Sequence, residues 1–264
     1  MAHVLRYCHR EKIPTFVLGK GSNVLFDDRG FNGCVILNRV EFIEPGQENL
    51  FRAGAGVGFN TLGILTARLG FTGLEFASGI PGTVGGAVFM NAGAHGCETG
   101  DVVDSVEIVT AEGTSRTLTR DNGELAWSYR TSPFQQMEGL AAIVAATFKL
   151  DKSGDARKRQ LTFMDSRRQT QPITAKTAGC VFRNPGGGQP SAGALLDQLG
   201  LKGLSIGGAQ VSEKHANFLV NTGSATCEDI RVLIDEVKKR VKEKTEVELH
   251  EEIRYVPHGY SSQQ

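Results

Sequence analysis

Two glycine-rich stretches contain the residue types that most directly suggest binding chemistry. The first reads Gly-Lys-Gly-Ser-Asn at 19–23 and follows a short apolar run; the second reads Ser-Gly-Ile-Pro-Gly-Thr-Val-Gly-Gly at 78–86. Glycine lets backbone N–H groups approach an anion closely, so either stretch could hold a pyrophosphate. The alternatives are a plain tight turn at 19–23 and a buried glycine-rich turn at 78–86. A P-loop is excluded at the first stretch, because Gly21 follows Lys20 and the GxxxxGK[ST] spacing is absent.

A third glycine run, Gly54, Gly56 and Gly58, has the spacing of an incomplete dinucleotide fingerprint. The GxGxxG pattern would need glycine where Phe59 stands, so the fingerprint is absent. We therefore expect these glycines to serve tight packing at the end of a strand.

The composition is that of a globular protein with an excess of glycine. Of the 264 residues, 33 are glycine, against a usual share of about 7%. There are 29 basic and 29 acidic side chains, so no net field attracts nucleic acid or a membrane surface. The uncharged stretch 79–94 contains Pro81 and several glycines and is not a membrane span. Five cysteines without CxxC spacing indicate a reducing compartment, with no disulfide framework and no metal site.

Periodicity and capping signals predict the elements that would position these stretches. The region 71–100 is too interrupted for one helix or strand and too apolar for a linker, so we expect a buried loop system there. Asn60, Ser191 and the pair Thr226 and Asp229 are predicted helix caps. The predicted helices are 2–11, 60–69, 151–172, 192–199 and 226–244, and the predicted strands are 15–18, 34–37, 49–58, 102–110, 114–118, 141–150 and 247–255.

Five motifs in this order resemble one enzyme family. They are Leu-Gly-Lys-Gly-Ser-Asn-Val-Leu at 18–25, Ser-Gly-Ile-Pro-Gly through Ala-Gly-Ala-His-Gly at 78–96, Ser-Tyr-Arg-Thr-Ser-Pro-Phe at 128–134, Ala-Gly-Cys-Val-Phe-Arg-Asn-Pro at 178–185 and Glu-Glu-Ile-Arg at 251–254. Together they resemble the UDP-N-acetylenolpyruvoylglucosamine reductases over nearly the whole chain. Each motif alone would be weak, but five in register are specific.

The resemblance implies an α+β fold in three parts. It combines a two-part FAD-binding domain of the vanillyl-alcohol-oxidase-like type with an α+β substrate-binding domain. We expect the first FAD-binding sub-domain at 1–42, the second at 43–165 and 248–264, and the substrate-binding domain at 166–247. The family usually has a further segment upstream of the first predicted helix, so we expect a missing N-terminal segment that would complete the first sub-domain.

The implied reaction is the NADPH-dependent reduction of UDP-N-acetylglucosamine enolpyruvate to UDP-N-acetylmuramate through FAD, in peptidoglycan precursor synthesis. NADPH reduces the flavin, and flavin N5 then passes hydride to the vinyl carbon of the substrate. The loops around 19–23 and 79–86 would hold the FAD pyrophosphate. The implied cofactor-binding residues are Gly19, Gly21, Ser22, Asn23, Gly79, Gly82, Thr83, Gly85, Gly86 and Asn91.

Three residues match the catalytic positions of the family. Arg130 would neutralise the negative charge that hydride addition places on the substrate carboxylate, and Glu252 matches the catalytic glutamate. Without the resemblance, Arg130 would be read as a surface ion pair and Glu252 as a strand-edge carboxylate. Glu251 should point to the opposite face of the predicted strand. Cys180 stands where the family commonly has a serine that protonates the alpha carbon.

The thiol at position 180 is a departure with a chemical consequence. An ordinary thiol has a pKa of about 8.5 and is a stronger acid than a serine hydroxyl, so proton donation should be preserved. The site would also become open to oxidation and alkylation. The alternative for Cys180 is a small buried core residue.

Substrate contacts are implied at Tyr129, Asn184 and Lys202, with Arg167 a weaker candidate. The run Glu-Lys-His-Ala-Asn at 213–217 cannot be assigned from spacing. The distance from Arg130 to Cys180 is only 50 residues, which indicates the shorter family type that lacks a tyrosine-bearing loop.

The partners we expect are the UDP-sugar substrate and NADPH, with no nucleic acid, membrane or metal, and a monomeric protein. A cytoplasmic location is expected, or a plastid if a transit peptide is missing from this chain. Two rivals remain: an FAD oxidase of the same fold that acts on an alcohol, and a truncated, non-catalytic nucleotide-binding relative.

Overall fold

The computed structural model describes residues 1–259, which form two compact units. The first unit contains residues 1–20 and 33–166, and the second contains residues 21–32 and the described chain from Arg167 onward. Each unit has its own apolar core. Helices and mostly antiparallel strands occur together, so the predicted α+β class is confirmed.

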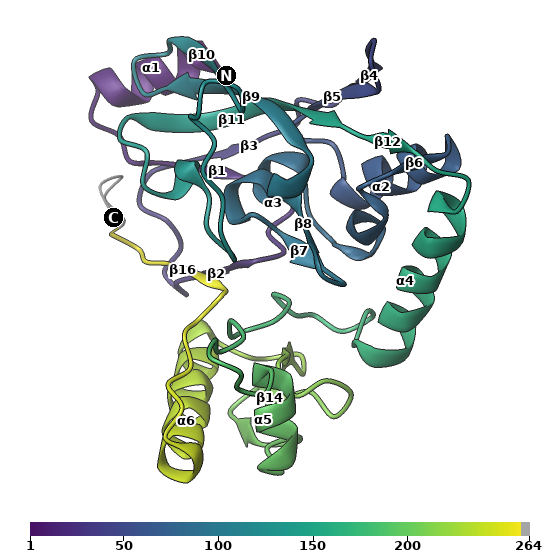
Figure 1. Ribbon diagram of the computed structural model, residues 1–264. Helices are drawn as coiled ribbons and strands as arrows, with labels where there is room; N and C mark the ends of the chain where they lie inside the picture. The colour runs from purple at the N-terminus through teal and green to yellow at the C-terminus, as the bar shows by residue number, and fades with distance from the viewer. Residues whose placement is uncertain (260–264) are drawn as a thin grey trace. The chain divides into compact units, whose positions relative to one another are not determined.

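A five-stranded antiparallel sheet forms the centre of the first unit (Figure 1). β9 and β11 form its middle, and Ile108 of β9 lies opposite Ile143 of β11. Valine, isoleucine and alanine at alternating positions allow these strands to bury one or both faces. In spatial order the strands are β10 (Ser115–Thr119), β9 (Val103–Thr110), β11 (Leu140–Lys149), β5 (Leu50–Gly54) and β4 (Ile43–Pro45).

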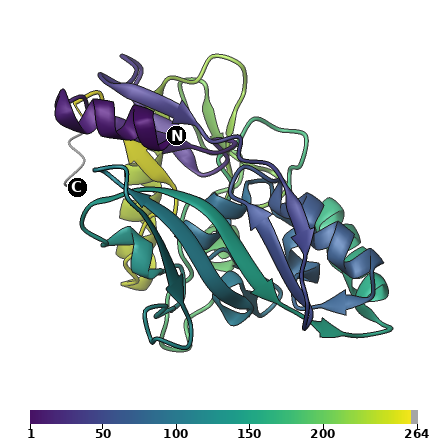
Figure 2. The ribbon, with the colours of Figure 1, turned by 90° about the horizontal axis from the view of Figure 1, so that it is seen from above.

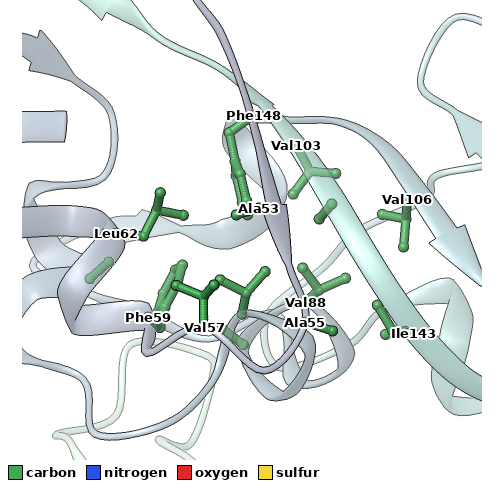
Figure 3. Packing of buried hydrophobic residues seen from close by; sticks show 14 of the residues in the cluster. Ala53, Ala55, Val57, Phe59, Leu62, Val88, Val103, Val106, Ile143 and Phe148 are labelled. Carbon is green, nitrogen blue, oxygen red and sulfur yellow. The ribbon is translucent and has the colours of Figure 1, made fainter. Parts of the chain in front are cut away.

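The main core of the first unit lies between this sheet and two helices, α2 (Phe59–Arg68) and α3 (Val84–Met90). Figure 3 shows Phe59 and Leu62 of α2 and Val88 of α3 close to side chains of β5, β9 and β11. All three labelled helix residues are fully buried. Burial of apolar area on this scale is the main stabilising contribution to the unit.

A smaller apolar cluster lies at α1 (Ala2–Arg10), β1 (Thr15–Leu18) and β3 (Cys34–Leu37). Leu5 of α1 packs with Val109 of β9 and Ala142 of β11. Both ribbon views show α1 beside the five-stranded sheet (Figure 1 and Figure 2). β1 and β3 pair in parallel, and this pairing brings the start of the 19–23 stretch to the edge of the unit's core.

The remaining elements of the first unit are short, except for α4 (Ala156–Thr170), whose last turn belongs to the second unit. They are β6 (Phe71–Thr72), η1 (Glu75–Gly79), β7 (Gly93–Ala94), β8 (Cys97–Glu98), η2 (Thr99–Asp101), η3 (Pro133–Gln135) and β12 (Asp151–Lys152).

The second unit is built around α6 (Cys227–Thr245), which begins with a capping box between Thr226 and Asp229. Leu233, Val237 and Val241 of α6 are buried in the core of this unit. The other elements are β2 (Val24–Phe26), α5 (Ala192–Gln198), β13 (Ser205–Ile206), β14 (Ala209–Val211), β15 (Leu219–Asn221) and β16 (Arg254–Val256). β16 pairs in parallel with β2, which joins two segments far apart in sequence.

Most predicted elements are confirmed, and the main errors lie at element ends. Asn60 is not a helix cap: α2 begins at Phe59, with Gly58 at the N-cap position and no side-chain cap. The helix starts one residue early because Phe59 is drawn into the core, and its N–H donates to the carbonyl of Gly82 at 3.0 Å. The predicted strand 247–255 is reduced to β16, because only these residues have β2 as a partner.

The region 71–100 is a series of short elements, as its interruptions predict, but it is not loop alone. It contains α3, which forms because the Thr83 hydroxyl accepts a hydrogen bond from Gly86 N at 3.3 Å and caps the helix. The glycines of the third run are used for close packing, as predicted. A Cβ at Gly56 would lie 2.8 Å from the Arg39 Cα, and one at Gly54 would overlap the Val40 carbonyl.

The predicted three-part division of the chain stays a prediction beside these two units. Its second sub-domain included residues 260–264, which lie outside the described residues. None of the helices described for residues 1–259 combines the length and the apolar character needed to cross a membrane.

Candidate functional site

In the first unit, the two glycine-rich stretches meet at Gly19 and Thr83. A Cβ at Gly19 would lie 2.5 Å from the Thr83 hydroxyl oxygen, so only glycine allows this approach. Thr83 also forms a β-bridge with Gly58, the residue that precedes α2. The structure thus brings together one residue from each of the predicted pyrophosphate-binding stretches, and it adds Gly58, which the sequence analysis assigned to packing.

The Lys20 side chain and the start of α2 both lie beside Gly58. A Cβ at Gly58 would lie 2.8 Å from the Lys20 amino nitrogen and 2.9 Å from both the Asn60 side-chain amide oxygen and the Thr61 hydroxyl. The first N–H groups of a helix carry a partial positive charge that favours anions. The sequence predicted no role for Lys20 once a P-loop was excluded. It gives no sign that Lys20 lies beside the start of α2, because the two are far apart in the chain.

The four glycines of the second stretch that are predicted near the cofactor differ in their surroundings. Gly85 is packed tightly, since its Cβ would lie 2.9 Å from the Ala55 Cβ, whereas Gly86 is exposed and has only the Thr83 hydroxyl within reach. Gly79 ends η1, and Gly82 accepts a backbone hydrogen bond from Phe59. Gly86 therefore presents open backbone, while Gly85 fixes the loop.

Asn91, predicted as a cofactor ligand, is fully buried and bonded within the chain. Its amide nitrogen donates to the Glu98 carboxylate and to the Ser128 carbonyl, both at 2.8 Å, and its oxygen accepts from Gly100 N at 2.8 Å. The residue ends α3 in the left-handed conformation, with φ 43°. Its contacts connect the end of α3 to the segment that carries Arg130.

Arg130 lies at the tip of a tight turn and has a strained backbone. Ser128 and Thr131 bond each other's backbone, with N···O distances of 3.2 and 2.9 Å, which leaves Tyr129 and Arg130 at the tip. Arg130 has φ 54°, which is uncommon for a residue with a side chain. Its guanidinium donates to the Gly93 carbonyl at 3.1 Å and lies 4.9 Å from the centroid of the half-exposed Tyr129 ring.

In the second unit, Asn23 and Glu252 lie side by side because β2 and β16 pair in parallel. The Asn23 amide donates to the Glu252 carbonyl at 3.2 Å, and Arg254 N donates to the Asn23 carbonyl at 3.0 Å. Gly21, which begins this segment, has φ 69°. The neighbouring Glu251 is exposed and pairs with Lys238 of α6 at 3.1 Å, so the two adjacent carboxylates have different surroundings.

Cys180 belongs to an extended segment that lies against the Glu252 segment. Glu252 N donates to the Val181 carbonyl at 2.7 Å, and Cys180 forms a β-bridge with Phe218 on its other side. Cys180 is partly exposed, which disagrees with a purely apolar core role. The preceding Gly179 has φ 85° and approaches the carbonyl of Ser22. The second unit therefore brings Ser22, Cys180 and Glu252 together.

A basic group lies near the thiol. Burial lowers the pKa of the Arg167 guanidinium, and the charge interaction with Cys180 opposes this shift. The sequence made Arg167 only a weaker substrate candidate, because the end of a polar helix does not indicate which of its charged side chains is buried. Burial raises the pKa values of Cys8, Cys97 and Cys227, that of Cys227 to about 11.

The predicted substrate contacts Asn184 and Lys202 have partners within the second unit. The Asn184 amide oxygen accepts from Ala192 N at 3.1 Å, at the start of α5, and the Lys202 ammonium pairs with Asp197 at 2.8 Å. Burial, and then the nearby Lys202 charge, lower the pKa of His215. His215 belongs to the run 213–217 that spacing left unassigned.

The chemistry of these groups is that of proton transfer and anion binding. A thiol, a carboxylate and a guanidinium are available, with glycine backbone for a diphosphate. No cluster of three metal-ligating side chains occurs within residues 1–259. Arg130 belongs to the first unit, whereas Cys180 and Glu252 belong to the second.

Comparisons with known proteins agree with this inventory. A family model described as the C-terminal domain of UDP-N-acetylenolpyruvoylglucosamine reductase matches residues 171–256, and one described as an FAD binding domain matches residues 1–119. The fold is therefore that of a FAD-binding domain followed by the C-terminal domain of these reductases.

Individual relatives match this chain over almost its whole length. The UDP-N-acetylenolpyruvoylglucosamine reductase of Protochlamydia amoebophila is 54% identical over 258 residues, which cover 98% of this chain and 84% of that protein. The corresponding reductase of Chlamydia muridarum is 46% identical, over 96% of this chain and 83% of the relative. The crystal structure of the Thermus caldophilus reductase matches with a TM-score of 0.81 and 34% identity, over 97% of this chain and 90% of that one. This chain belongs to the UDP-N-acetylenolpyruvoylglucosamine reductase family.

Proposed function

We propose that this protein reduces UDP-N-acetylglucosamine enolpyruvate to UDP-N-acetylmuramate with FAD and NADPH, as a step of peptidoglycan precursor synthesis. Family membership over almost the whole chain supports the reaction class. The observation that carries the proposal to this chain's own residues is the packing of the Cys180 segment against the Glu252 segment in the second unit. That packing places an acidic thiol and a carboxylate on adjacent backbone.

The cofactors of this oxidoreductase are FAD and NADPH, and the residues of the first unit fit the diphosphate part of such a group. Gly19 and Thr83 pack so closely that a Cβ at Gly19 would clash with the Thr83 hydroxyl, which holds the two glycine-rich stretches together, and Lys20 lies beside the start of α2. Bound FAD would supply a carrier that takes hydride from NADPH and gives it to the vinyl carbon of the substrate. The N–H of the exposed Gly86 donates to the Thr83 hydroxyl at 3.3 Å within the chain, and it would exchange this partner for a phosphate oxygen.

The proposed cofactor-binding residues fall into two groups. In the first unit, Gly19, Gly79, Gly82, Gly85 and Gly86 shape and expose backbone, while Thr83 and Asn91 fix the loops around them. In the second unit, Gly21, Ser22 and Asn23 precede β2. Asn23 also holds the Glu252 backbone, so cofactor contact and catalytic geometry share one residue there.

The catalytic roles follow from the charge that the reaction develops. Hydride addition at the vinyl carbon leaves negative charge delocalised from the alpha carbon into the carboxylate of the substrate. The Arg130 guanidinium neutralises this charge, and the Cys180 thiol donates the proton to the alpha carbon. Glu252 acts on the same intermediate as a protonated group or through a bridging water. Arg167 beside Cys180 stabilises the thiolate that remains until the thiol is reprotonated.

The proposed substrate contacts are Tyr129, Asn184 and Lys202. Tyr129 exposes its ring beside the Arg130 guanidinium. Both Lys202 and Asn184 have partners within the chain. To bind the diphosphate or sugar, Lys202 would exchange its contact with Asp197, and Asn184 would exchange its contact with Ala192 N. Lysine and amide side chains suit such exchange because their donors form a hydrogen bond to phosphate oxygens.

One experiment tests the proposal against its two rivals. The purified chain is examined for a flavin absorption spectrum, and NADPH consumption is followed with and without UDP-N-acetylglucosamine enolpyruvate. We expect a flavin spectrum and NADPH loss that depends on the sugar nucleotide. A protein that binds no flavin would support a non-catalytic nucleotide-binding relative. Oxygen-dependent turnover of an alcohol would support an oxidase.

A further inference from the structure

Gln135 bonds directly to the backbone of the proposed catalytic Arg130. Its side-chain nitrogen donates to the Arg130 carbonyl at 3.1 Å and to the Phe89 carbonyl at 2.9 Å. Phe89 lies in α3, so one amide group connects the Arg130 turn to the helix that follows the second glycine stretch. Gln135 is partly buried and lies in η3, five positions after Arg130.

The Arg130 backbone needs such an external restraint. A residue with a Cβ is disfavoured at φ 54°, so a free turn would relax toward a negative φ and would redirect the guanidinium. Within the turn, Ser128 and Thr131 form two backbone hydrogen bonds and the Thr131 hydroxyl donates to the Tyr129 carbonyl at 3.3 Å, but none of these bonds reaches the Arg130 backbone. Additional contacts must therefore hold the strained conformation.

Other side chains hold the turn before and after Arg130. Asn91 holds the Ser128 carbonyl, before the strained residue, and Ser132 bonds the Phe89 carbonyl at 2.6 Å, after it. The contact from Gln135 reaches the backbone carbonyl of Arg130 itself, while the Arg130 guanidinium donates to the Gly93 carbonyl. An amide nitrogen has two donors, and both are used here to bridge two carbonyl oxygens.

We propose that Gln135 is a positioning residue for the proposed reaction, which holds Arg130 in its left-handed conformation so that its guanidinium meets the developing carboxylate charge. The inference rests on the proposed function. Because Gln135 acts through Arg130, it affects the transfer of electrons to the enolpyruvyl substrate and not the reduction of flavin by NADPH.

The test uses Gln135→Met in the FAD-loaded protein, since methionine keeps the length of the side chain and removes the donor. We expect the rate of flavin reoxidation by the enolpyruvyl sugar nucleotide to fall roughly tenfold, the loss expected for two neutral hydrogen bonds at a catalytic position. The rate of flavin reduction by NADPH should stay within about twofold of the parent protein. The exposed neighbour provides the matched control: Gln136→Met should change neither rate.

A double-mutant cycle decides whether the effect passes through Arg130. In an Arg130→Ala background, Gln135→Met should lower the reoxidation rate by less than about twofold further. A full additional loss in that background, or an equal loss in the NADPH step, would overturn the proposal. The melting temperature of each apoprotein separates misfolding from misplacement.

A second variant keeps the inference testable if the methionine protein does not fold. Lysine at this position still offers N–H donors to the two carbonyl oxygens, so Gln135→Lys should retain most of the reoxidation rate. A folded lysine variant as slow as Arg130→Ala would contradict the proposal. If the parent protein does not oxidise NADPH in response to the sugar nucleotide, the proposed function fails first; if it does and Gln135→Met is unaffected, only this inference fails.

Discussion

The two units hold their proposed catalytic residues by different kinds of contact. In the first unit, the Arg130 turn depends on side-chain amides of Asn91 and Gln135 that bond to backbone carbonyls. In the second unit, the Cys180 and Glu252 segments are joined by backbone hydrogen bonds, which continue into the pairing of β16 with β2. A backbone ladder does not depend on which side chain stands at position 180 or 252, whereas the Arg130 turn depends on particular neighbours.

This difference explains how a thiol can occupy a position that is commonly serine in the family. The extended segment is fixed by Val181 and Phe182, through Asn217 and Glu252, and the backbone of Cys180 forms a bridge with Phe218. A change of side chain at position 180 should therefore alter chemistry and leave the fold unchanged. Changes around Arg130 should alter both.

The largest expected effect is the loss of the proton donor. Cys180→Ala should slow flavin reoxidation by the enolpyruvyl substrate by about 10²- to 10⁴-fold, the usual contribution of general acid catalysis. Cys180→Ser should retain turnover, because a hydroxyl can donate the same proton. NADPH should reduce the flavin at the parent rate in both variants. Stopped-flow absorbance of the flavin measures the two half-reactions separately.

Thermal unfolding of the same variants tests whether the fold of the second unit depends on the Cys180 side chain. Both Cys180 variants should melt within a few degrees of the parent protein, since the segment is fixed by its backbone. An alanine variant with normal turnover would remove Cys180 from the mechanism. A large loss of stability would show that the side chain supports the fold of the second unit.

The next largest effect should come from removing one amide in each unit. Asn91→Ala breaks three hydrogen bonds at a fully buried position and should reduce the free energy of unfolding by about 2 to 4 kcal/mol. Asn23→Ala breaks the side-chain hydrogen bond to the Glu252 carbonyl beside an intact strand pair and should cost about 1 kcal/mol. Urea unfolding of the two apoproteins gives the comparison. Equal losses would show that side chains restrain both units to the same degree.

The sequence was sufficient for elements with strong local signals. The capping box at Thr226 and Asp229 and the hydroxyl cap at Ser191 were both predicted, because these contacts lie within four residues. Asn60 was assigned wrongly as a cap because the start of α2 is set by a long-range bond from Phe59 to Gly82. The length of β16 likewise depends on β2, more than two hundred residues earlier in the chain.

The proposed site divides in the same way. Cys180, Arg130 and Glu252 could be named as candidates from the motifs. Gln135 could not, since a glutamine after a proline turn gives no sign that its amide returns to the backbone five residues earlier. The internal bonds of Asn91 were also hidden, because a buried asparagine and a ligand-binding asparagine have the same sequence pattern.

A buried ion pair makes the stability of the first unit depend on acid pH. Although burial opposes it, bonds from Gly73 N, Thr72 and Arg159 lower the pKa of Glu75. The Arg159 guanidinium lies 2.8 Å from that carboxylate, which is 6% exposed. Arg159→Leu should lower the free energy of unfolding by about 1 to 2 kcal/mol at pH 7, discounted because the arginine is partly exposed.

The sign of the pH effect follows from the lowered pKa of Glu75. Its stabilisation is present above the ordinary carboxyl pKa of about 4.3 and is lost as pH falls through the lower value of the folded state. The difference between the parent protein and Arg159→Leu should therefore shrink below about pH 4. Arg157→Leu, on the same helix, is the control and should show no such trend. A difference that does not change with pH would exclude the ion pair as its cause.

The smallest expected effect concerns His215, whose titratable side chain supports the Cys180 segment through Asn217. His215 Nδ1 accepts a hydrogen bond from Asn217 N at 3.2 Å, and the Asn217 carbonyl accepts from Val181 N at 2.9 Å. Burial lowers the pKa of His215, so its stabilising contribution is present above the ordinary value of about 6.5 and is lost as pH falls through the folded value.

Between pH 7.5 and 5.5 the parent protein should therefore lose less than about 1 kcal/mol of unfolding free energy through His215. In His215→Gln this part of the pH dependence should disappear, whereas His250→Gln, at an exposed position, should retain it. Urea unfolding at the two pH values measures all three proteins. Because the Cys180 segment keeps its backbone bonds to Glu252, protonation of His215 should loosen one side of the segment without releasing it. A pH dependence that persists in His215→Gln would mean that the His215 side chain does not stabilise the Cys180 segment. The segment would then be held by its other hydrogen bonds, unlike the Arg130 turn, which depends on neighbouring side chains.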